Sequence, residues 1–321
     1  MRRPEVRTQE SGDQNRGAIG VDIMKMSKWV VMALVAGSLW AKEASGGSLT
    51  PSGAPAPTMK TLTEVEPRTP ISSVPVTLSE PGSYYVTTNL TTPLGAAITV
   101  SNNDVSIDLM GFVLSAPYGD GVVATMDHCD RLTVRHGTIS DCGGMAIDAR
   151  YCRGGRFSDL VLSGNDYAGI APGIDAVVDN CLILSNKSGV IWADGCLIDG
   201  CQVLNNEDDG INASQNCRIK GNICRDNGYG GANLANIHAT GAGNRIEDNQ
   251  VLGAGCGLSL DAAGNYVAGN YVKGNGTNYS FAAGNQLNLL LCEIPETLSW
   301  PCAVKLAGTL VCSRTAVNGV L

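Results

Sequence analysis

Large aromatic side chains and charged side chains are both scarce in this chain. Aromatic residues make up 5% of its 321 residues, only 3 of them Phe, and charged residues 16%, below the usual quarter. A core therefore has to be built from Val, Ile, Leu, Ala and Cys. Basic clusters are missing and the net charge is -8, so we expect no nucleic-acid partner, because phosphate binding needs such clusters.

The apolar run "WVVMALVAGSLW" is too short to cross a membrane. It covers 12 residues, Trp29 to Trp40, where a membrane-spanning helix needs about 20. Lys25 and Lys28 precede the run, and Ala41 offers a small residue for cleavage, which is typical of a bacterial export signal. A buried or interfacial helix is the alternative.

The first 70 residues divide into three segments. Residues 1–23 fit neither a signal nor a domain, and Met24 or Met26 is the expected start. Residues 24–41 are the predicted signal peptide, which places the protein outside the cell or at its surface. Residues 42–70 are rich in Ser, Gly, Pro and Thr and lack apolar periodicity, so they are predicted to form a disordered linker.

Glycine, in contrast, is abundant, with 40 residues, and a short phrase recurs. "GCLIDGCQV" begins at Gly195 and returns as "NCRIKGNIC" 21 residues later. Similar positions extend the pattern into columns of apolar residues: Phe157, Val178, Ile198, Ile219, Ile246 and Val267; Leu162, Ile183, Val203, Cys224, Val251 and Val272; and Ile147, Ile170, Val190, Ile211, Ile237 and Leu258. A sustained period near 21 predicts a solenoid.

Each repeat holds short alternating stretches bounded by Gly, Asn and Asp. Helical spacing of the apolar residues is missing, and Gly or Asn interrupts the chain about every ten residues. Three short strands and three corners per repeat predict an all-β parallel β-helix of roughly eight coils over residues 71–285. Inward residues such as Ile198 and Ile219 should be buried, with Asp199, Lys220 and Glu247 exposed.

The corners carry two further expectations. Asn222, Asn249 and Asn270 occupy the same corner of consecutive coils, where their side-chain amides can hydrogen-bond along the stack. One repeat is longer because of "GYGGANLANI" between Gly228 and Ile237, and we expect the extra residues to protrude as a loop.

The segments "TPISSVPVTLSEPGSYYVTTNL", "VSIDLMGFVLS" and "LTVRHGTIS" resemble secreted bacterial β-helix repeat proteins. Residues 71–285 resemble the right-handed parallel β-helix proteins of the pectate-lyase-like superfamily. The resemblance implies a right-handed coil. It implies activity only weakly, since the superfamily includes lyases, hydrolases and epimerases acting on polysaccharides as well as repeat proteins without an assigned reaction.

Hydrolases of the polygalacturonase type in this superfamily have paired Asp residues, a Gly-His-Gly and an Arg-Ile-Lys. "EDDG" at Glu207–Gly210 and "RIK" at Arg218–Lys220 are similar to two of these, but their spacing fails and no Gly-His-Gly lies between them. We interpret Asp208 and Asp209 as ordinary turn residues.

A mixed charged stripe is the best candidate site in the sequence. Lyases of the pectate type hold Ca²⁺ with outward carboxylates, and the ion needs several oxygen ligands. We define the charged stripe as six residues that flank the Phe157 column: Asp179, Asp199, Arg218, Lys220, Arg245 and Glu247. Lys220 or Arg218 would be the catalytic base, and Asp179 and Asp199 would face Ca²⁺ or a uronate. The alternative is a solvated face whose charges alternate.

Histidine and cysteine offer no further site in the sequence. His128, His136 and His238 fall on separate coils without metal-ligand spacing, and we expect surface or corner roles for them. Most of the 12 cysteines should be free, buried thiols, because stacked Cβ atoms would lie too far apart for a disulfide.

Two functions stay open at this point. One is an exported module without catalytic activity that binds a polysaccharide or cell-surface glycan and needs no cofactor. The other is a lyase or uronate epimerase that uses the charged stripe, with Ca²⁺ as a cofactor if it is a lyase. The missing hydrolase spacing, the scarce aromatics and the few histidines favour the module.

The C-terminal tail, residues 286–321, repeats the opening of the β-helix. Thr297-Leu298-Ser299 matches Thr77-Leu78-Ser79 at a shift of 220 residues. We interpret the tail as the start of a second copy, with a terminal cap as the alternative, and Cys302 with Cys312 as the expected disulfide.

Overall fold

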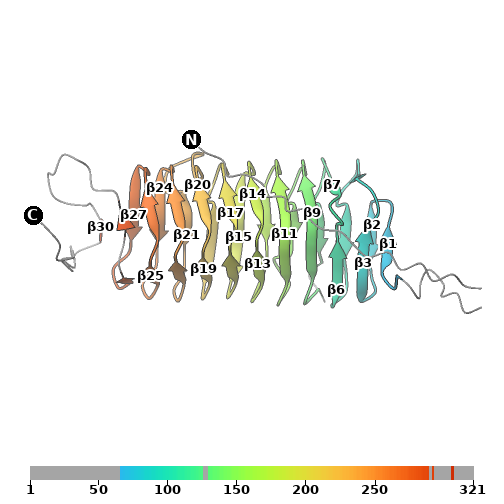
Figure 1. The fold of residues 1–321 in the computed structure, drawn as a ribbon, viewed down its shortest axis with the longest axis horizontal. Coiled ribbons are helices and arrows are strands. Elements are labelled where there is room, and N and C mark those ends of the chain that lie inside the picture. Colours follow the sequence, from blue (N-terminus) through green and yellow to red (C-terminus); the bar gives the residue numbers. More distant parts are fainter. Residues whose placement is uncertain (1–65, 126–128, 289–290, 293–304, 307–321) are drawn as a thin grey trace, which may run out of the picture. The chain divides into compact units, whose positions relative to one another are not determined.

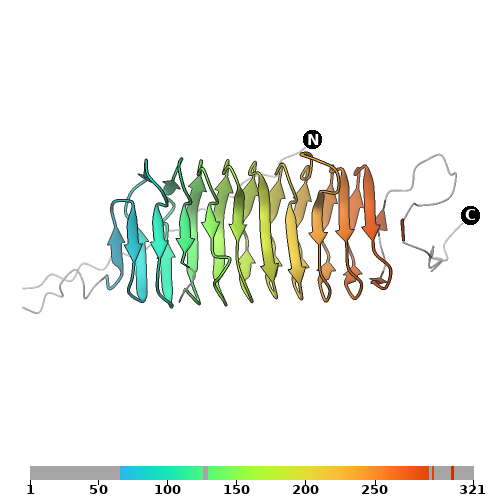
Figure 2. The same ribbon diagram turned by 180° about the vertical axis from the view of Figure 1, so that it is seen from behind.

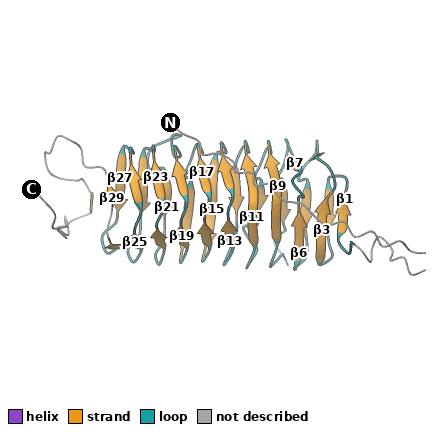
Figure 3. Cartoon of the chain, viewed as in Figure 1, coloured by secondary structure: helices purple, strands orange, loops and turns teal. Residues whose placement is uncertain are grey.

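The computed structural model describes residues 66–125, 129–288, 291–292 and 305–306. The predictions for the signal peptide, for most of the linker and for Cys302 with Cys312 lie outside these residues. Within them every regular element is a strand, and no helix long and apolar enough to cross a membrane occurs. Figure 3 shows the strands following one another along the stack.

Two sheets of parallel strands form the fold (Figure 1). The first sheet contains 19 strands: β1 (Thr69–Ile71), β3 (Gly82–Val86), β4 (Leu90–Thr91), β6 (Val105–Asp108), β7 (Val113–Ser115), β9 (Thr133–Ser140), β11 (Arg156–Ser163), β13 (Val177–Asp179), β14 (Leu182–Leu184), β16 (Leu197–Asp199), β17 (Gln202–Leu204), β19 (Arg218–Lys220), β20 (Ile223–Arg225), β22 (Arg245–Glu247), β23 (Gln250–Leu252), β25 (Tyr266–Ala268), β26 (Tyr271–Lys273), β28 (Gln286–Asn288) and β29 (Leu291–Cys292).

The second sheet contains 11 strands: β2 (Val76–Leu78), β5 (Ile98–Val100), β8 (Val122–Ala124), β10 (Ile147–Asp148), β12 (Ala168–Ala171), β15 (Ser188–Asp194), β18 (Ile211–Gln215), β21 (Ala235–Ala239), β24 (Cys256–Leu260), β27 (Thr277–Phe281) and β30 (Lys305–Leu306). The first sheet is two columns of short strands joined where β9 and β11 run through both. Each coil therefore has three strand positions, as predicted.

The stack has about ten turns rather than the predicted eight. The coils missed by the sequence analysis precede residue 147, where Val76, Ile98, Val122 and Ile147 follow one another in the second sheet at longer intervals than 21 residues. Longer corners there hide the period, although the strands still pair in register. At the other end, Lys305 and Leu306 pair with Ser280 and Phe281.

The apolar columns form the core. Ile198, Ile219, Ile246 and Val267 pair in succession, and each has no exposed surface. The predicted inward register is therefore confirmed. Because no coil covers its own inner face, each ladder residue is buried by the coils above and below it.

Asparagine ladders close the corners. The Asn222 side chain donates to Asn249 Oδ1 at 3.0 Å, and Asn249 donates to Asn270 Oδ1 at 2.9 Å, which confirms the predicted ladder. A second ladder was missed, in which Asn206 donates to Asn227 and Asn227 to Asn236. These amides satisfy buried main-chain groups that would otherwise lose their hydrogen bonds to water.

The insertion that lengthens one repeat forms a loop between strands β20 and β21. Residues 229–233 are exposed and lie outside any strand, as predicted. Ala235 and Asn236 belong instead to strand β21, so the predicted loop was too long at its end. Asn236 keeps the ladder position, which shows why register resumes at once after the insertion.

Eight cysteines of the described part of the chain are free thiols, all of them buried except the half-buried Cys256: Cys142, Cys152, Cys181, Cys196, Cys201, Cys217, Cys224 and Cys256. This confirms the predicted thiols for the described part of the chain. Burial raises the pKa of Cys142 to about 12, so this thiol stays protonated and unreactive near neutral pH.

Candidate functional site

The six residues of the charged stripe lie together on the outside of the first sheet. The backbone pairs Asp179 with Asp199, Asp199 with Lys220, and Lys220 with Glu247, along strands β13, β16, β19 and β22. Arg218 pairs with Arg245 two positions earlier on the same strands. Parallel register places these side chains in two adjacent rows along the stack. Within each row, neighbouring side chains are one strand spacing apart.

The stripe is largely neutralised by its own ion pairs. Lys220 Nζ lies 2.7 Å from Asp199 Oδ2, and Glu247 lies 3.1 Å from Arg218 Nε and 2.7 Å from Arg245 Nη2. The hydrogen bond from Arg245 and the positive charges beside it hold the pKa of Glu247 below its ordinary value. For Asp179 no ion pair is found among the described residues.

These pairs correct one prediction. Asp199, Lys220 and Glu247 point outward, but their side chains are only 31%, 35% and 14% exposed, because each covers its partner. They also bear on chemistry. A catalytic base must be able to approach the substrate proton, whereas Lys220 is in contact with Asp199 and Arg218 with Glu247.

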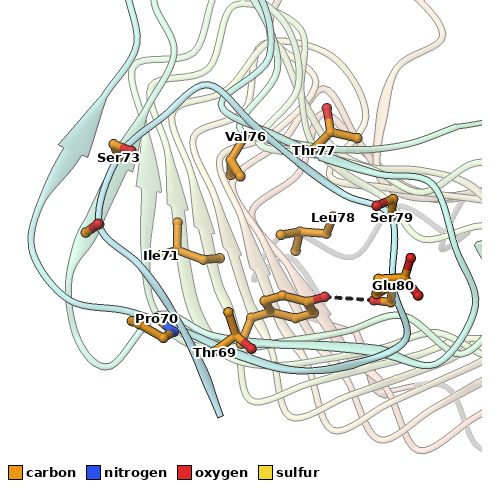
Figure 4. Close-up of a pocket in the computed structure, with 11 residues that line it drawn as sticks. Thr69, Pro70, Ile71, Ser73, Val76, Thr77, Leu78, Ser79 and Glu80 are labelled. Carbon is orange, nitrogen blue, oxygen red and sulfur yellow. Dashed lines mark hydrogen bonds between the residues drawn. The ribbon is translucent and has the colours of Figure 1, made fainter.

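A hollow lined by described residues lies away from the charged stripe, at the N-terminal end of the stack (Figure 4). Its volume is 290 Å³, and the side chains of Ile71, Val76 and Leu78 line it. Tyr84 donates a 2.8 Å hydrogen bond to the carbonyl of Glu80 at its rim. No residue of the charged stripe lines this hollow.

A histidine that the sequence analysis assigned to the surface is instead held between two carboxylates. On strand β21, His238 Nδ1 lies 2.9 Å from Asp209 and Nε2 lies 3.0 Å from Asp261. The side chain of His238 is only 13% exposed. Burial by itself lowers the pKa of His238, but the hydrogen bonds and charges of Asp209 and Asp261 outweigh it and raise the pKa to about 9.

Asp209 is more than the turn residue that was predicted. Its carboxylate also accepts hydrogen bonds from Asn212 Nδ2 at 2.8 Å and from the main-chain nitrogen of Ala235 at 2.7 Å. Both carboxylate oxygens are therefore used, and the residue is buried. The cluster Asp209–His238–Asp261 links three successive coils of the second sheet and positions a charged imidazole at its outer surface.

The exposure of His136 agrees with the surface or corner role that was predicted for it. His136 is about half exposed and lies 3.4 Å from Asp108 and 3.5 Å from Asp159. His128 lies outside the described residues. Among the residues that the structure describes, no group of three His, Cys, Asp or Glu side chains has the geometry of a metal site.

The sequence did contain a signal for His238. The position after each inward residue of the Ile147 column points outward, and reading that column gives Asn212 beside His238 and His238 beside Ser259. Only the first-sheet columns were read in this way. Asp209 and Asp261 lie before and after their strands, so their approach to His238 depends on corner geometry that spacing does not reveal.

Comparisons with known proteins agree with the fold. The family model described as "Right handed beta helix region" matches residues 120–278. No curated protein sequence matches.

Solved structures share the architecture at low identity. Pectate lyase Pel9A is 14% identical, with a TM-score of 0.45 over 70% of this chain, which spans 66% of the length of that protein. The A-module of the Azotobacter vinelandii mannuronan C-5 epimerase AlgE6 is 14% identical, with a TM-score of 0.42 over 67% of this chain and 92% of that one. The Dettilon tailspike protein is 13% identical, with a TM-score of 0.35 over 69% of this chain and 60% of that one.

The parallel stack and the matched family model agree on the class of the fold, and the family model gives its right hand. This chain is a right-handed parallel β-helix protein.

Proposed function

We propose that this protein is an exported β-helix module that binds a polysaccharide at the cell surface without catalysing its cleavage. The observation that carries the proposal is the pairing within the charged stripe. Lys220 is held by Asp199, and Arg218 is held by Glu247, so both expected bases are already engaged in ion pairs within the stripe.

A rigid ladder surface suits binding of an extended polymer. Successive strands present side chains at a spacing of about 4.8 Å along the stack, and the buried columns beneath them fix the backbone. A repeating polymer can contact such a surface at several points without a deep pocket. Export itself rests on the sequence of residues 24–41.

A second candidate function is catalysis, and one observation favours it. The Asp209–His238–Asp261 cluster is a strongly oriented acid–base group at the surface of the second sheet. A lyase or uronate epimerase acts by removing a proton beside a sugar carboxylate, and enzymes tune such groups by burial and neighbouring charges. The charged stripe is the other possible location, with Asp179, Asp199, Glu247 and Arg245 contacting the uronate and Ca²⁺ bound by Asp179 and Asp199.

One experiment separates the two functions. The protein is incubated with polygalacturonate and with alginate, with and without Ca²⁺, while the absorbance of unsaturated uronate and the ratio of epimeric uronates are followed. The proposal expects no change in either, together with retention of the protein in gels that contain a polysaccharide.

Turnover that His238→Gln abolishes would establish catalysis at the histidine cluster. Turnover lost in Lys220→Gln but kept in His238→Gln would place it on the charged stripe. Either result would overturn the proposed module.

A further inference from the structure

Strand β15 contains a break in the otherwise regular ladder. Val190 pairs with Ile211 and Ala193 pairs with Ala213, so β15 holds one residue more than β18 over this stretch. Trp192 lies in this bulge with φ at 55°. A bulky residue in the left-handed region costs free energy and is uncommon, whereas most corners of this fold use Gly, Asn or Asp there.

The bulge directs the Trp192 ring toward the outer surface. The Arg150 guanidinium carbon lies 4.3 Å from the centroid of the Trp192 indole. The ring centroids of Tyr167 and Trp192 lie 6.2 Å apart, and the two ring planes are tilted by 46°. The Tyr151 ring centroid lies 6.0 Å from the same guanidinium carbon. We call Tyr151, Tyr167, Trp192 and Arg150 the aromatic platform.

Arg150 is fixed in place rather than free to move. Its Nε and Nη2 atoms donate to the two carboxylate oxygens of Asp148 at 2.8 and 2.7 Å. This bidentate pair holds the guanidinium plane over the indole and cancels its charge. No partner of Nη1 is found among the described residues, so this nitrogen can still donate hydrogen bonds.

The platform has an apolar floor of its own. Met145, Ala168, Ala171 and Ile191 form a buried cluster that is separate from the main core of the β-helix. The three rings nevertheless keep large exposed fractions: 55% for Tyr151, 43% for Tyr167 and 40% for Trp192. The rings therefore do more than cover the floor, because a covering role would bury them more completely.

Strands β10, β12 and β15 are consecutive neighbours in the second sheet, and β15 is labelled in Figure 1. Tyr151 follows β10, Tyr167 precedes β12, and Trp192 lies within β15. At about 4.8 Å per strand the platform extends roughly 10 Å along the stack. Rigid aromatic rings on such a surface bind at a low entropic cost, because few rotatable bonds must be fixed.

We propose that the aromatic platform is a binding site for an uncharged pyranose polymer, which stacks its C–H faces on Trp192 and the two tyrosines. This proposal rests on the proposed function and names its site and ligand class. The sugar hydroxyls have Arg150 Nη1, the tyrosine hydroxyls and the Asp148 carboxylate as hydrogen-bonding partners. The charge of Arg150 is already cancelled, Asp120 and Asp148 lie nearby, and the chain carries a net charge of -8, which disfavours an acidic polymer.

The test is affinity electrophoresis of the full chain in gels that contain soluble β-glucan, galactomannan, polygalacturonate or alginate. We expect retention by a neutral polymer and about tenfold weaker binding for Trp192→Ala, because a central aromatic contact is removed. Trp192→Phe should keep most of the binding, since it keeps a ring. The matched control is Tyr229→Ala, which removes a 68% exposed ring from the protruding loop and should bind as the wild type does.

The thermal unfolding of each variant is measured in parallel, so that lost binding is counted only for folded protein. If Trp192→Ala unfolds early, Tyr167→Ala and Arg150→Ala replace it, with the same expected loss.

Three results would overturn the inference. Wild-type retention that survives all three alanine variants would overturn the platform and leave the proposed function intact. Preference for polygalacturonate or alginate would overturn the ligand class. Failure of the wild type to bind any of the four polymers would overturn the proposed function and the platform together.

Discussion

The outer surfaces of the two sheets differ although the same coils build both. On the first sheet, the charged stripe continues the backbone register without a break, and its acids and bases pair with one another. On the second sheet, the ladder contains the Trp192 bulge, an aromatic platform above a separate apolar cluster, and a histidine between two carboxylates. Figure 2 shows the stack from the side opposite to Figure 1.

This difference suggests which surface of the solenoid is structural and which one binds a ligand. In a column that repeats in register, each side chain finds its packing, hydrogen-bonding or ion-pair partner on the next coil. A residue that departs from the repeat lacks such a partner. At Trp192 the left-handed backbone conformation also costs free energy. We therefore infer that the regular stripe is structural and that the irregular second-sheet surface carries binding.

The largest expected effect tests the core beneath both surfaces. Ile219→Ala should lower the free energy of unfolding by about 2–5 kcal/mol, because the neighbouring coils cannot collapse into the cavity. Ile223→Ala on the next strand is the matched control; that side chain is 36% exposed and its loss should cost far less. Urea unfolding measures both, and equal costs would contradict the inward register.

The second prediction concerns the pH dependence of the stability that His238 contributes on the second sheet. The folded-state pKa of His238 is raised from 6.5 to about 9, so its contribution to stability is complete below pH 6.5 and is lost as the pH rises through 9. The loss should be about 3 kcal/mol, since one pKa unit corresponds to about 1.4 kcal/mol.

The measurement is the free energy of unfolding from pH 6 to pH 10 for the wild type and for His238→Gln. The difference between them should shrink across this range. His136→Gln is the control and should follow the wild type, because its side chain is half exposed. A constant difference between the wild type and His238→Gln would show that the Asp209–His238–Asp261 cluster does not hold a charged imidazole.

The smallest effect is expected on the charged stripe. The Lys220–Asp199 pair is 2.7 Å long, but both side chains are about one third exposed, so solvent screens much of its energy. In a double-mutant cycle with Lys220→Gln and Asp199→Asn, the coupling energy should be below about 1 kcal/mol and should fall further in 1 M salt. A coupling of several kcal/mol would mean that the stripe is more strongly organised than a solvated face.

The repeat was predictable wherever one physical cause acts at every coil. Burial of Ile198 and Ile219 and the ladder of Asn222, Asn249 and Asn270 follow from columns that any stacked coil must satisfy. The coil count was too low because the early corners are longer, and corner length is not constrained by the strands that it joins.

The second-sheet features were not predictable in the same way. Trp192 occupies a bulge, and a register shift of one residue leaves no trace in the column of inward residues. Arg150 and Tyr151 come from one coil, Tyr167 from the next and Trp192 from a third, so the spacing of the sequence does not show that they meet. Aromatic scarcity over the whole chain, read as an argument against sugar stacking, also missed that three rings gather on one surface.

The most direct test of the account compares the two surfaces in one titration. The retained neutral polymer is titrated into the wild type, into Trp192→Ala, and into the double variant Asp199→Asn with Lys220→Gln, all at the same ionic strength. The account predicts about tenfold weaker binding for Trp192→Ala and wild-type binding for the double variant. Wild-type binding by Trp192→Ala, with binding lost in the double variant, would place the glycan on the charged stripe and contradict the account.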